Sequence, residues 1–184
     1  MIKYIAFDFV GVLVTEKDIE LTDNEDRLER LFGDNISDED YLLKAEETIG
    51  NDLNIVNITK EVIDKLYLVK YKELFKSIKE KYNDVKIIIA TNHVSFVKDF
   101  IKKSFDNNYL DDILISSEIH MIKPNISFYY YILNKYSINP SELLFLDDNI
   151  DNINGAKSIG INTIKVDPDS DILEEVIDFV KRSN

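Results

Sequence analysis

Short runs of apolar, mostly β-branched residues recur along this chain, and segments with helical periodicity separate the later runs. The runs are continuous rather than alternating, which is typical of strands that are covered on both faces. Strands that alternate with helices form parallel sheets, so the pattern predicts an α/β fold with a Rossmann-like, doubly wound parallel sheet. The predicted strands are Ile2–Phe7, Val85–Ala90, Ile113–Ile115, Leu143–Leu146 and Asn162–Val166. The predicted helices that follow them are His93–Phe105, Asn125–Tyr136, Asp151–Ile159 and Ile172–Lys181.

The stretch between the first two predicted strands breaks this rhythm, because it predicts helices and no strand. The segment from Ser37 to Asp40 resembles a capping box that opens a helix, and Gly50 would end that helix. Thr59 is the predicted N-cap of a long helix that runs through Ile78. So much helix exceeds what one crossover needs, and we expect a helical cap inserted over the sheet edge where ligands bind. The expected division is a core, residues 1–14 and 82–184, and a cap, residues 15–81.

Charge and composition exclude several classes of protein. Lys and Arg total 22 against 35 Asp and Glu, which gives a formal net charge of −13. We therefore expect neither nucleic acid nor a membrane surface as a partner, because both attract basic surfaces. The chain has no cysteine and two histidines, so thiolate sites and three-histidine sites are excluded. Any metal is then held mainly by oxygen, which suits Mg²⁺.

The apolar N-terminal stretch Met1–Val14 has some likeness to a signal peptide. Asp8 lies in the middle of it, however, and no small-residue cleavage site follows. The stretch is also too short to cross a membrane as a helix. It predicts a buried strand that ends at a carboxylate, and we expect a cytoplasmic protein.

Polar residues lie where the predicted strands end, which is where open α/β sheets bind their ligands. Each of them has a simple structural explanation when taken alone, such as a helix N-cap or a solvated loop. Their occurrence together, in this order and each near the sheet edge, indicates a catalytic site. The residues are Asp8, the pair Thr91 and Asn92, Lys123, and the pair Asp147 and Asp148.

This order of a nucleophilic Asp, a Thr, a Lys and an acidic pair resembles the haloacid dehalogenase-like hydrolase superfamily. The resemblance covers most of the chain, including the strand before each motif and the cap after the first one. Its most specific part is the run Phe145–Ala156. That run resembles the branch with the bacterial glucose-1-phosphate phosphatase and the phosphatase domain of epoxide hydrolases. Response-regulator receivers use similar residues, but their acidic pair comes first in the chain.

The resemblance implies a Mg²⁺-dependent phosphatase that hydrolyses a small phosphorylated metabolite, with a sugar phosphate as the expected substrate. It implies that Asp8 attacks the phosphoryl group and forms an aspartyl-phosphate, which divides one difficult displacement into two easier ones. The Thr91 hydroxyl and the Asn92 backbone N–H, at a helix N-terminus, are then expected to bind phosphate oxygens. Lys123 is expected to neutralise the charge on Asp8 and on the phosphoryl group.

The same resemblance implies a metal site. Mg²⁺ is expected between the carboxylates of Asp8 and Asp148 and the backbone carbonyl of Val10. Asp147 and Asn152 are expected to hold metal-bound water or to steady the ligands from behind. A chain with a net charge of −13 repels phosphate esters, which is a further reason to expect that activity depends on the metal.

The chain departs from the resembling family at two positions. Most phosphatases of the superfamily carry a second Asp two residues after the nucleophile, which protonates the leaving oxygen, and here that residue is Val10. Such general acid–base catalysis contributes about 10²–10⁴ in rate. Three interpretations stay open: substrates with good leaving groups, a proton from His93 or from a cap carboxylate, or a weak or inactive protein. For His93 we expect a surface position at a helix start. His120 stands where the family commonly has Gly before its Lys-Pro.

Two other classes of function stay open. A metal-independent 2-haloacid dehalogenase on the same fold also lacks the second Asp, but it usually replaces the acidic pair with Ser or Asn. A non-catalytic regulatory or binding member would use the tyrosines as an interface, and Tyr129–Tyr131 lie in one predicted helix. A homodimer is equally open. The presence of Asp8, Thr91, Lys123 and Asp148 together favours catalysis over a binding role, and the acidic pair argues against the dehalogenase.

Overall fold

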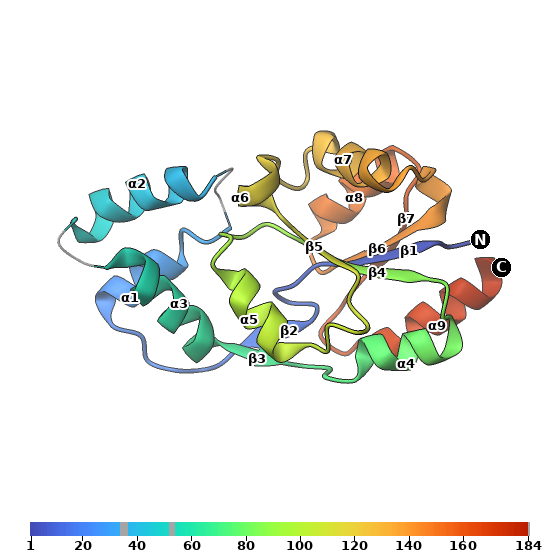
Figure 1. Ribbon diagram of the computed structural model, residues 1–184, viewed down its shortest axis with the longest axis horizontal. Coiled ribbons are helices and arrows are strands. Elements are labelled where there is room, and N and C mark those ends of the chain that lie inside the picture. The colour runs from blue at the N-terminus through green and yellow to red at the C-terminus, as the bar shows by residue number, and fades with distance from the viewer. Residues whose placement is uncertain (34–36, 52–53, 184) are drawn as a thin grey trace.

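The computed structural model describes residues 1–33, 37–51 and 54–183. A parallel five-stranded sheet with helices on both faces confirms the predicted α/β fold (Figure 1). The strand order is β5-β4-β1-β6-β7, so β1 lies in the middle and pairs with β4 on one side and β6 on the other. The strands are β1 (Tyr4–Phe7), β4 (Lys86–Thr91), β5 (Asp112–Ile115), β6 (Leu143–Asp147) and β7 (Asn162–Lys165).

Each face of the sheet has its own hydrophobic core, because side chains alternate along every strand. Ile5 and Phe7 of β1 belong to one core, and Ala6 of β1 belongs to the other. The first face is covered by α4 (Leu74–Lys81), α5 (Val97–Ser104) and α9 (Ile172–Ser183), and the second by α7 (Ile126–Tyr136) and α8 (Ile150–Ser158). Burial of both faces explains why the strands are continuous apolar runs in the sequence.

Two short helical elements complete the core. They are α6 (Ser116–Ile119) and a 3₁₀ helix, η1 (Pro140–Glu142). His120 ends α6 in the left-handed conformation, with φ 57°. Glycine adopts this conformation without steric cost, which explains why the resembling family commonly has Gly at this position. In α7, Tyr129 is buried and Tyr130 is exposed.

The inserted segment contains two strands, so the expectation of helices alone is wrong. β2 (Val14–Glu16) pairs antiparallel with β3 (Tyr67–Val69), and this small sheet joins the start of the insertion to its later part. Each strand has three residues, too few for periodicity to reveal them. Between them lie α1 (Asp23–Glu29), α2 (Asp38–Ile49) and α3 (Ile55–Leu66).

The predicted long helix from Thr59 to Ile78 is also wrong. Asn54 caps α3, and Thr59 lies buried inside the helix with its hydroxyl 2.6 Å from the hydroxyl of Tyr41 in α2. The helix ends at Leu66 because the chain then pairs with β2, and helical structure resumes only in α4. The α2 prediction is confirmed, since Ser37 caps that helix and Gly50 ends it.

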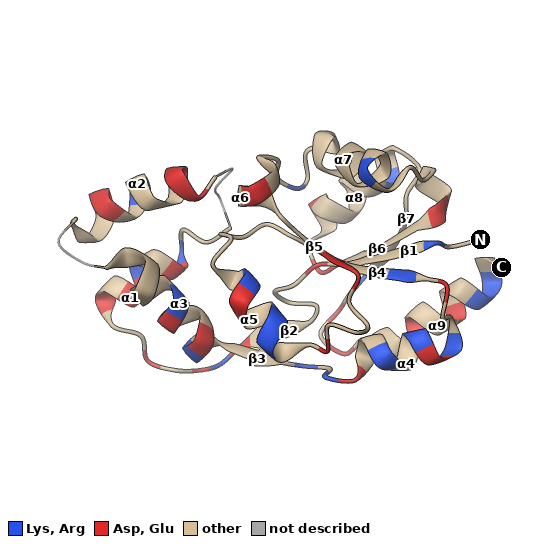
Figure 2. Cartoon of the chain, in the orientation of Figure 1, with Lys and Arg blue, Asp and Glu red and all other residues tan. Residues whose placement is uncertain are grey.

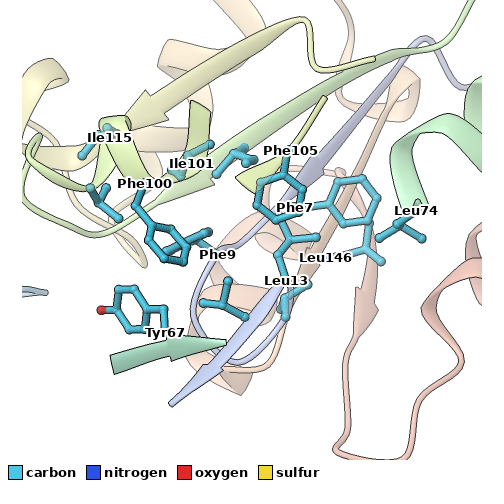
Figure 3. Packing of buried hydrophobic residues seen from close by; sticks show 14 of the residues in the cluster. Phe7, Phe9, Leu13, Tyr67, Leu74, Phe100, Ile101, Phe105, Ile115 and Leu146 are labelled. Atoms are coloured by element: carbon cyan, nitrogen blue, oxygen red, sulfur yellow. The ribbon is translucent and has the colours of Figure 1, made fainter. Parts of the chain in front are cut away.

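The helices α1, α2 and α3 lie beyond the carboxyl end of β1, whereas α4 lies beside α9 under the sheet (Figure 1). The division into a core, residues 1–14 and 82–184, and a cap, residues 15–81, stays a prediction. In this article the cap helices are α1, α2 and α3. Aromatic side chains join them to the core, and Figure 3 shows Tyr67 of β3 beside Phe9 and Phe100, with ring centroids 5.5 and 5.8 Å away.

Acidic residues occur on both parts of the molecule. Figure 2 shows Asp and Glu on the cap helices and on α9 of the core. No helix in the described part of the chain is long and apolar enough to cross a membrane. An anionic ligand approaching this acidic surface would need a local site where positive charge is concentrated, because like charges repel.

Candidate active site

The loops at the carboxyl edge of the sheet bring the predicted residues together. Asp8 follows β1, Thr91 ends β4 and Asp147 ends β6, and these three strands are neighbours in the sheet. Lys123, from the loop between α6 and α7, reaches the same point. All four side chains are buried. Parallel strands end at a common edge, which is why residues far apart in the chain meet here.

Lys123 joins two carboxylates inside the protein. Its Nζ donates to Asp8 Oδ1 at 2.7 Å and to Asp147 Oδ2 at 2.7 Å. Asn152 Nδ2 donates to both oxygens of Asp147, at 3.1 and 3.0 Å. The Asn149 backbone N–H adds a further bond to Asp147, at 2.8 Å. A buried charge is tolerated only when it is paired in this way, so the ammonium group has one defined position beside Asp8.

Burial and the neighbouring charges shift the pKa values of the three titratable groups Asp8, Asp148 and Lys123. Burial raises the pKa of Asp8 to about 6, and the charge of Asp147 adds to the rise while Lys123 opposes it. Burial and Asp147 also raise the pKa of Asp148. Burial acts to lower the pKa of Lys123, but the two carboxylates beside it outweigh this and raise it. The lysine therefore stays charged, and a cation bound at the carboxylates would relieve their repulsion.

Three carboxylates form a group that fits a metal ion. One oxygen each from Asp8, Asp147 and Asp148 lies within 4.8 Å of the others. A set of oxygen donors suits a hard cation such as Mg²⁺. Gly11 makes the close approach of Asp148 feasible, because its φ is 85° and a Cβ there would lie 2.2 Å from Asp148 Oδ2. The participation of the Val10 carbonyl stays a prediction.

Asn92 has a structural function that the sequence analysis missed. Its Nδ2 donates to the Lys123 carbonyl at 2.9 Å, and its Oδ1 accepts the Lys123 backbone N–H at 2.9 Å. These two bonds hold the backbone of Lys123 against the end of β4. The only signal in the sequence was the residue type, because an Asn side chain has an amide that can both donate to a backbone carbonyl and accept from a backbone N–H. The binding of phosphate by the Asn92 backbone N–H stays a prediction.

The loop after β4 is not a helix N-terminus, which corrects the prediction for Thr91 and Asn92. The helix α5 begins at Val97 rather than at His93. Before it, the His93 N–H donates to Ser116 Oγ at 3.0 Å, and the Ser95 N–H donates to Asp38 Oδ1 at 2.9 Å. The Ser95 hydroxyl donates to the other oxygen of Asp38. Asp38 is the first residue of α2, so it ties a cap helix to this loop.

His93 is buried, which corrects its expected surface position. Its Nε2 lies 2.9 Å from the Tyr67 hydroxyl, and its Nδ1 lies 3.2 Å from the Val94 carbonyl oxygen. Burial lowers the pKa of His93 to about 4. Phe32 of the inserted segment packs on the imidazole, with ring centroids 5.1 Å apart. His93 is therefore a neutral ring that joins the inserted segment to the core.

A cavity of about 240 Å³ lies between the sheet edge and the inserted segment. It is smaller than the roughly 300–1,000 Å³ of ordinary ligand pockets, so it suits a small group. A larger hollow of about 410 Å³ along α9 contains none of the predicted site residues. The cavity is lined by Val10, Asn92 and His93 from the sheet edge and by Glu16, Glu29, Arg30, Phe32, Gly33 and Tyr67 from the inserted segment.

Comparison with known proteins identifies the family of this chain and several relatives. The family model of the haloacid dehalogenase-like hydrolases matches residues 5–166. The D-ribitol-5-phosphate phosphatase of Bacteroides thetaiotaomicron is 26% identical over 204 residues, which cover 96% of this chain and 97% of that protein. Two other curated relatives are much longer, and the match spans only 18% and 11% of their length.

Two solved structures share the fold over nearly the whole chain. A HAD-like family hydrolase from Porphyromonas gingivalis has a TM-score of 0.76 and 19% identity, covering 98% of each chain. A HAD family enzyme from Bacteroides thetaiotaomicron, in complex with magnesium and inorganic phosphate, has a TM-score of 0.71 and 17% identity over 94% of this chain and 98% of that one. With the family model matched over most of its length, the chain belongs to the haloacid dehalogenase-like hydrolase family.

Proposed function

We propose that the chain is a Mg²⁺-dependent phosphatase that hydrolyses a small phosphorylated metabolite through an aspartyl-phosphate on Asp8. The observation that carries this proposal is the buried chain of Asp8, Lys123 and Asp147, with Asp148 beside it at the sheet edge. Phosphoryl transfer depends mainly on positioning and on neutralisation of charge. A nucleophilic carboxylate with a fixed ammonium group 2.7 Å away supplies both.

In the proposed mechanism Asp8 is the nucleophile. Its Oδ1 accepts the hydrogen bond from Lys123, and its Oδ2 attacks phosphorus. The new O–P bond forms as the ester P–O bond breaks, and the electron pair of that bond leaves with the alcohol oxygen. Water then attacks the phosphorus of the aspartyl-phosphate, so that inorganic phosphate is released and the Asp8 carboxylate is restored. The two displacements replace one direct hydrolysis.

The remaining site residues are assigned by the same proposal. Asp8, Asp148 and the Val10 carbonyl would hold Mg²⁺, which when bound neutralises charge on the phosphoryl oxygens. Asp147 and Asn152 would support these ligands, and their mutual hydrogen bonds suit that role. Thr91, Lys123 and the Asn92 N–H would bind phosphate oxygens. Burial, with a smaller contribution from the charge of Asp147, raises the pKa values of Asp8 and Asp148, and a bound cation would offset both effects, which supports the proposed metal site.

A sugar or polyol phosphate is the proposed substrate. One relative that matches nearly the whole chain is a D-ribitol-5-phosphate phosphatase. The cavity of about 240 Å³ has room for a small leaving group, and polar side chains of the proposed cap, residues 15–81, line part of it. A small polar cavity that Val10, two residues after Asp8, lines favours a compact hydroxyl-bearing substrate over a large apolar one.

Release of inorganic phosphate from a panel of esters, with and without Mg²⁺, tests the proposal. The panel pairs sugar 1-phosphates and acyl phosphates with alkyl esters such as ribitol 5-phosphate. We expect turnover only with the metal, and none from Asp8→Asn. Asp151→Asn is the matched control, since Asp151 is an exposed Asp on α8. Turnover of no ester, or metal-independent release of chloride from 2-chloroacids, would contradict the phosphatase.

A further inference from the structure

Val10 cannot transfer a proton, so the leaving group must find its proton elsewhere in the site. The cavity that Val10 lines also contains acidic side chains of the inserted segment. We propose that Glu29, the last residue of α1, donates the proton to the leaving oxygen and thereby adapts the site to phosphate esters of small, uncharged, hydroxyl-bearing alcohols. This inference rests on the proposed phosphatase activity, and it identifies the group that replaces the missing acid.

The other titratable groups of the cavity are unsuited to this role. His93 is neutral, because burial lowers its pKa to about 4, and both of its ring nitrogens already have partners. Burial raises the pKa of Tyr67 far above its ordinary value, and its hydroxyl is within hydrogen-bond distance of His93. Arg30 pairs with Asp26 at 3.0 Å and has no proton to give near neutral pH. Glu16 is exposed on β2.

Glu29 differs from these groups in its surroundings. It is half-buried, and it lines the cavity together with Val10 and Asn92, which flank the proposed phosphate position. Burial raises the pKa of Glu29, and the charges of Glu16 and Asp26 raise it further, while Arg30 opposes them. A carboxyl group that keeps its proton closer to neutral pH is suited to general acid catalysis.

Glu29 lies in the same cavity as two residues of the sheet edge. One of them is Val10, two residues after Asp8, and the other is Asn92. We therefore expect a leaving group attached to a phosphoryl group at Asp8 to extend into this cavity, toward Glu16 and Glu29. The charge of Glu16 repels a second anionic group, and both acidic side chains accept hydrogen bonds from hydroxyl groups, which defines the alcohol class of the proposal.

The proposed proton transfer balances as follows. As the ester P–O bond breaks, its electron pair moves to the leaving oxygen, and the Glu29 carboxylic acid gives its proton to that oxygen. The alcohol leaves neutral, and Glu29 becomes a carboxylate. In the second displacement this carboxylate takes a proton from the attacking water, so that Glu29 is again an acid when inorganic phosphate departs.

The test compares two esters that differ in how much they need an acid. Ribitol 5-phosphate releases a strongly basic alkoxide, whereas 4-nitrophenyl phosphate releases a stable phenolate. We expect Glu29→Gln to lower kcat/KM, which reports the first displacement, by about 10²-fold or more on ribitol 5-phosphate and by less than about threefold on 4-nitrophenyl phosphate. Glu16→Gln is the matched control in the same cavity, and we expect it to change KM while the ratio of kcat on the two esters stays that of the wild type.

Several outcomes would overturn the assignment. One is an equal loss of kcat/KM on both esters from Glu29→Gln, and another is the same leaving-group dependence from Glu16→Gln. The wild type alone supplies a measurement that needs no variant: its kcat/KM across alkyl and aryl phosphates should depend weakly on the pKa of the leaving alcohol. A wild type that hydrolyses only aryl and acyl phosphates would contradict Glu29 as the acid yet leave the phosphatase intact. A wild type that hydrolyses no ester would contradict the phosphatase itself.

Discussion

The sheet-edge half of the candidate site and its cap-side half hold their charges in different ways. At the sheet edge, Lys123 is buried between Asp8 and Asp147. Asn152 donates hydrogen bonds to both carboxylate oxygens of Asp147. On the cap side, Glu16 and Glu29 are less buried, and the nearest charges to Glu29 are mostly of its own sign.

Under the proposed function, this difference assigns separate roles to the two halves. Buried charges are stable only with complete partners, so we expect the sheet-edge half to be rigid and to perform the same chemistry on every substrate. Polar groups that line a cavity without complete partners gain them from a ligand, so we expect the cap-side half to distinguish one substrate from another. Substitutions in the two halves should therefore have separable effects.

The largest effect is expected from Asp8→Asn, which removes the proposed nucleophile from the sheet-edge half. We expect activity on every ester to fall by at least about 10³-fold, because no other group takes over the covalent step. The thermal stability of the metal-free protein, in contrast, should not fall. Since burial and Asp147 raise the pKa of Asp8 to about 6, its ionised form is unfavourable in the metal-free fold at pH 7.5. Calorimetry should show a Tm equal to or above that of the wild type, and a lower Tm would contradict this account.

Asn92→Ala tests whether the backbone of Lys123 must be held in place. The substitution removes both 2.9 Å bonds between the Asn92 amide and the Lys123 peptide groups. By analogy with residues that orient metal ligands, we expect a loss of about 10–100-fold in kcat on aryl and alkyl esters alike. Asn154→Ala, at an exposed position of α8, is the control. Loss on alkyl esters alone would show that Asn92 belongs functionally to the cap-side half.

His93→Gln tests whether His93, which lies between the two halves, is a neutral ring. The quantity measured is the pH dependence of the free energy of unfolding, not the activity. The pKa of His93 falls from 6.5 to about 4 on folding, so the folded state disfavours the protonated ring. Stability from this group is complete above pH 6.5 and is lost as the pH falls toward 4. Between pH 7 and pH 5 the wild type should lose about 2 kcal/mol more than the variant, measured by urea unfolding in EDTA. Equal losses would contradict a buried neutral ring.

The smallest effect is expected from Asp38→Ala, which breaks the link between α2 and the loop after β4. Both oxygens of Asp38 accept hydrogen bonds from Ser95. We expect KM for ribitol 5-phosphate to rise severalfold, on the order of 3–10, because such bonds contribute about 1 kcal/mol. The kcat on 4-nitrophenyl phosphate should stay near the wild-type value. Glu39→Ala, at the next position of α2, should change neither, and a fall in kcat on both esters would place Asp38 in the sheet-edge half.

Much of the sheet-edge half was predictable from the sequence. The apolar runs before Asp8, Thr91 and Asp147 are local signals, because a strand buried on both faces must be apolar throughout. Neighbouring parallel strands end at one edge, so the meeting of these residues followed from the order of the runs. The family resemblance rested on the same motifs, and the family model confirms it over residues 5–166.

The cap-side half was not predictable to the same degree. The pairing of β2 with β3 joins Val14 to Val69, far apart in the chain and in strands of three residues each. No local pattern signals such a pair, and without it the helix from Ile55 had no visible reason to end at Leu66. The cavity that contains Glu16 and Glu29 depends on this pairing.

The sequence by itself determined the strands of the five-stranded sheet and the main helices that follow them, the family and the residues that meet at the sheet edge, since hydrophobic periodicity and strand ends are local properties. Only the tertiary structure decided that His93 is buried, that Asn92 holds Lys123, and that Glu29 shares a cavity with Val10. Those facts depend on contacts between distant segments. His93 is buried and the cavity forms only when the inserted segment packs against the sheet, and the bonds of Asn92 form only when the loop after β4 meets the loop that contains Lys123.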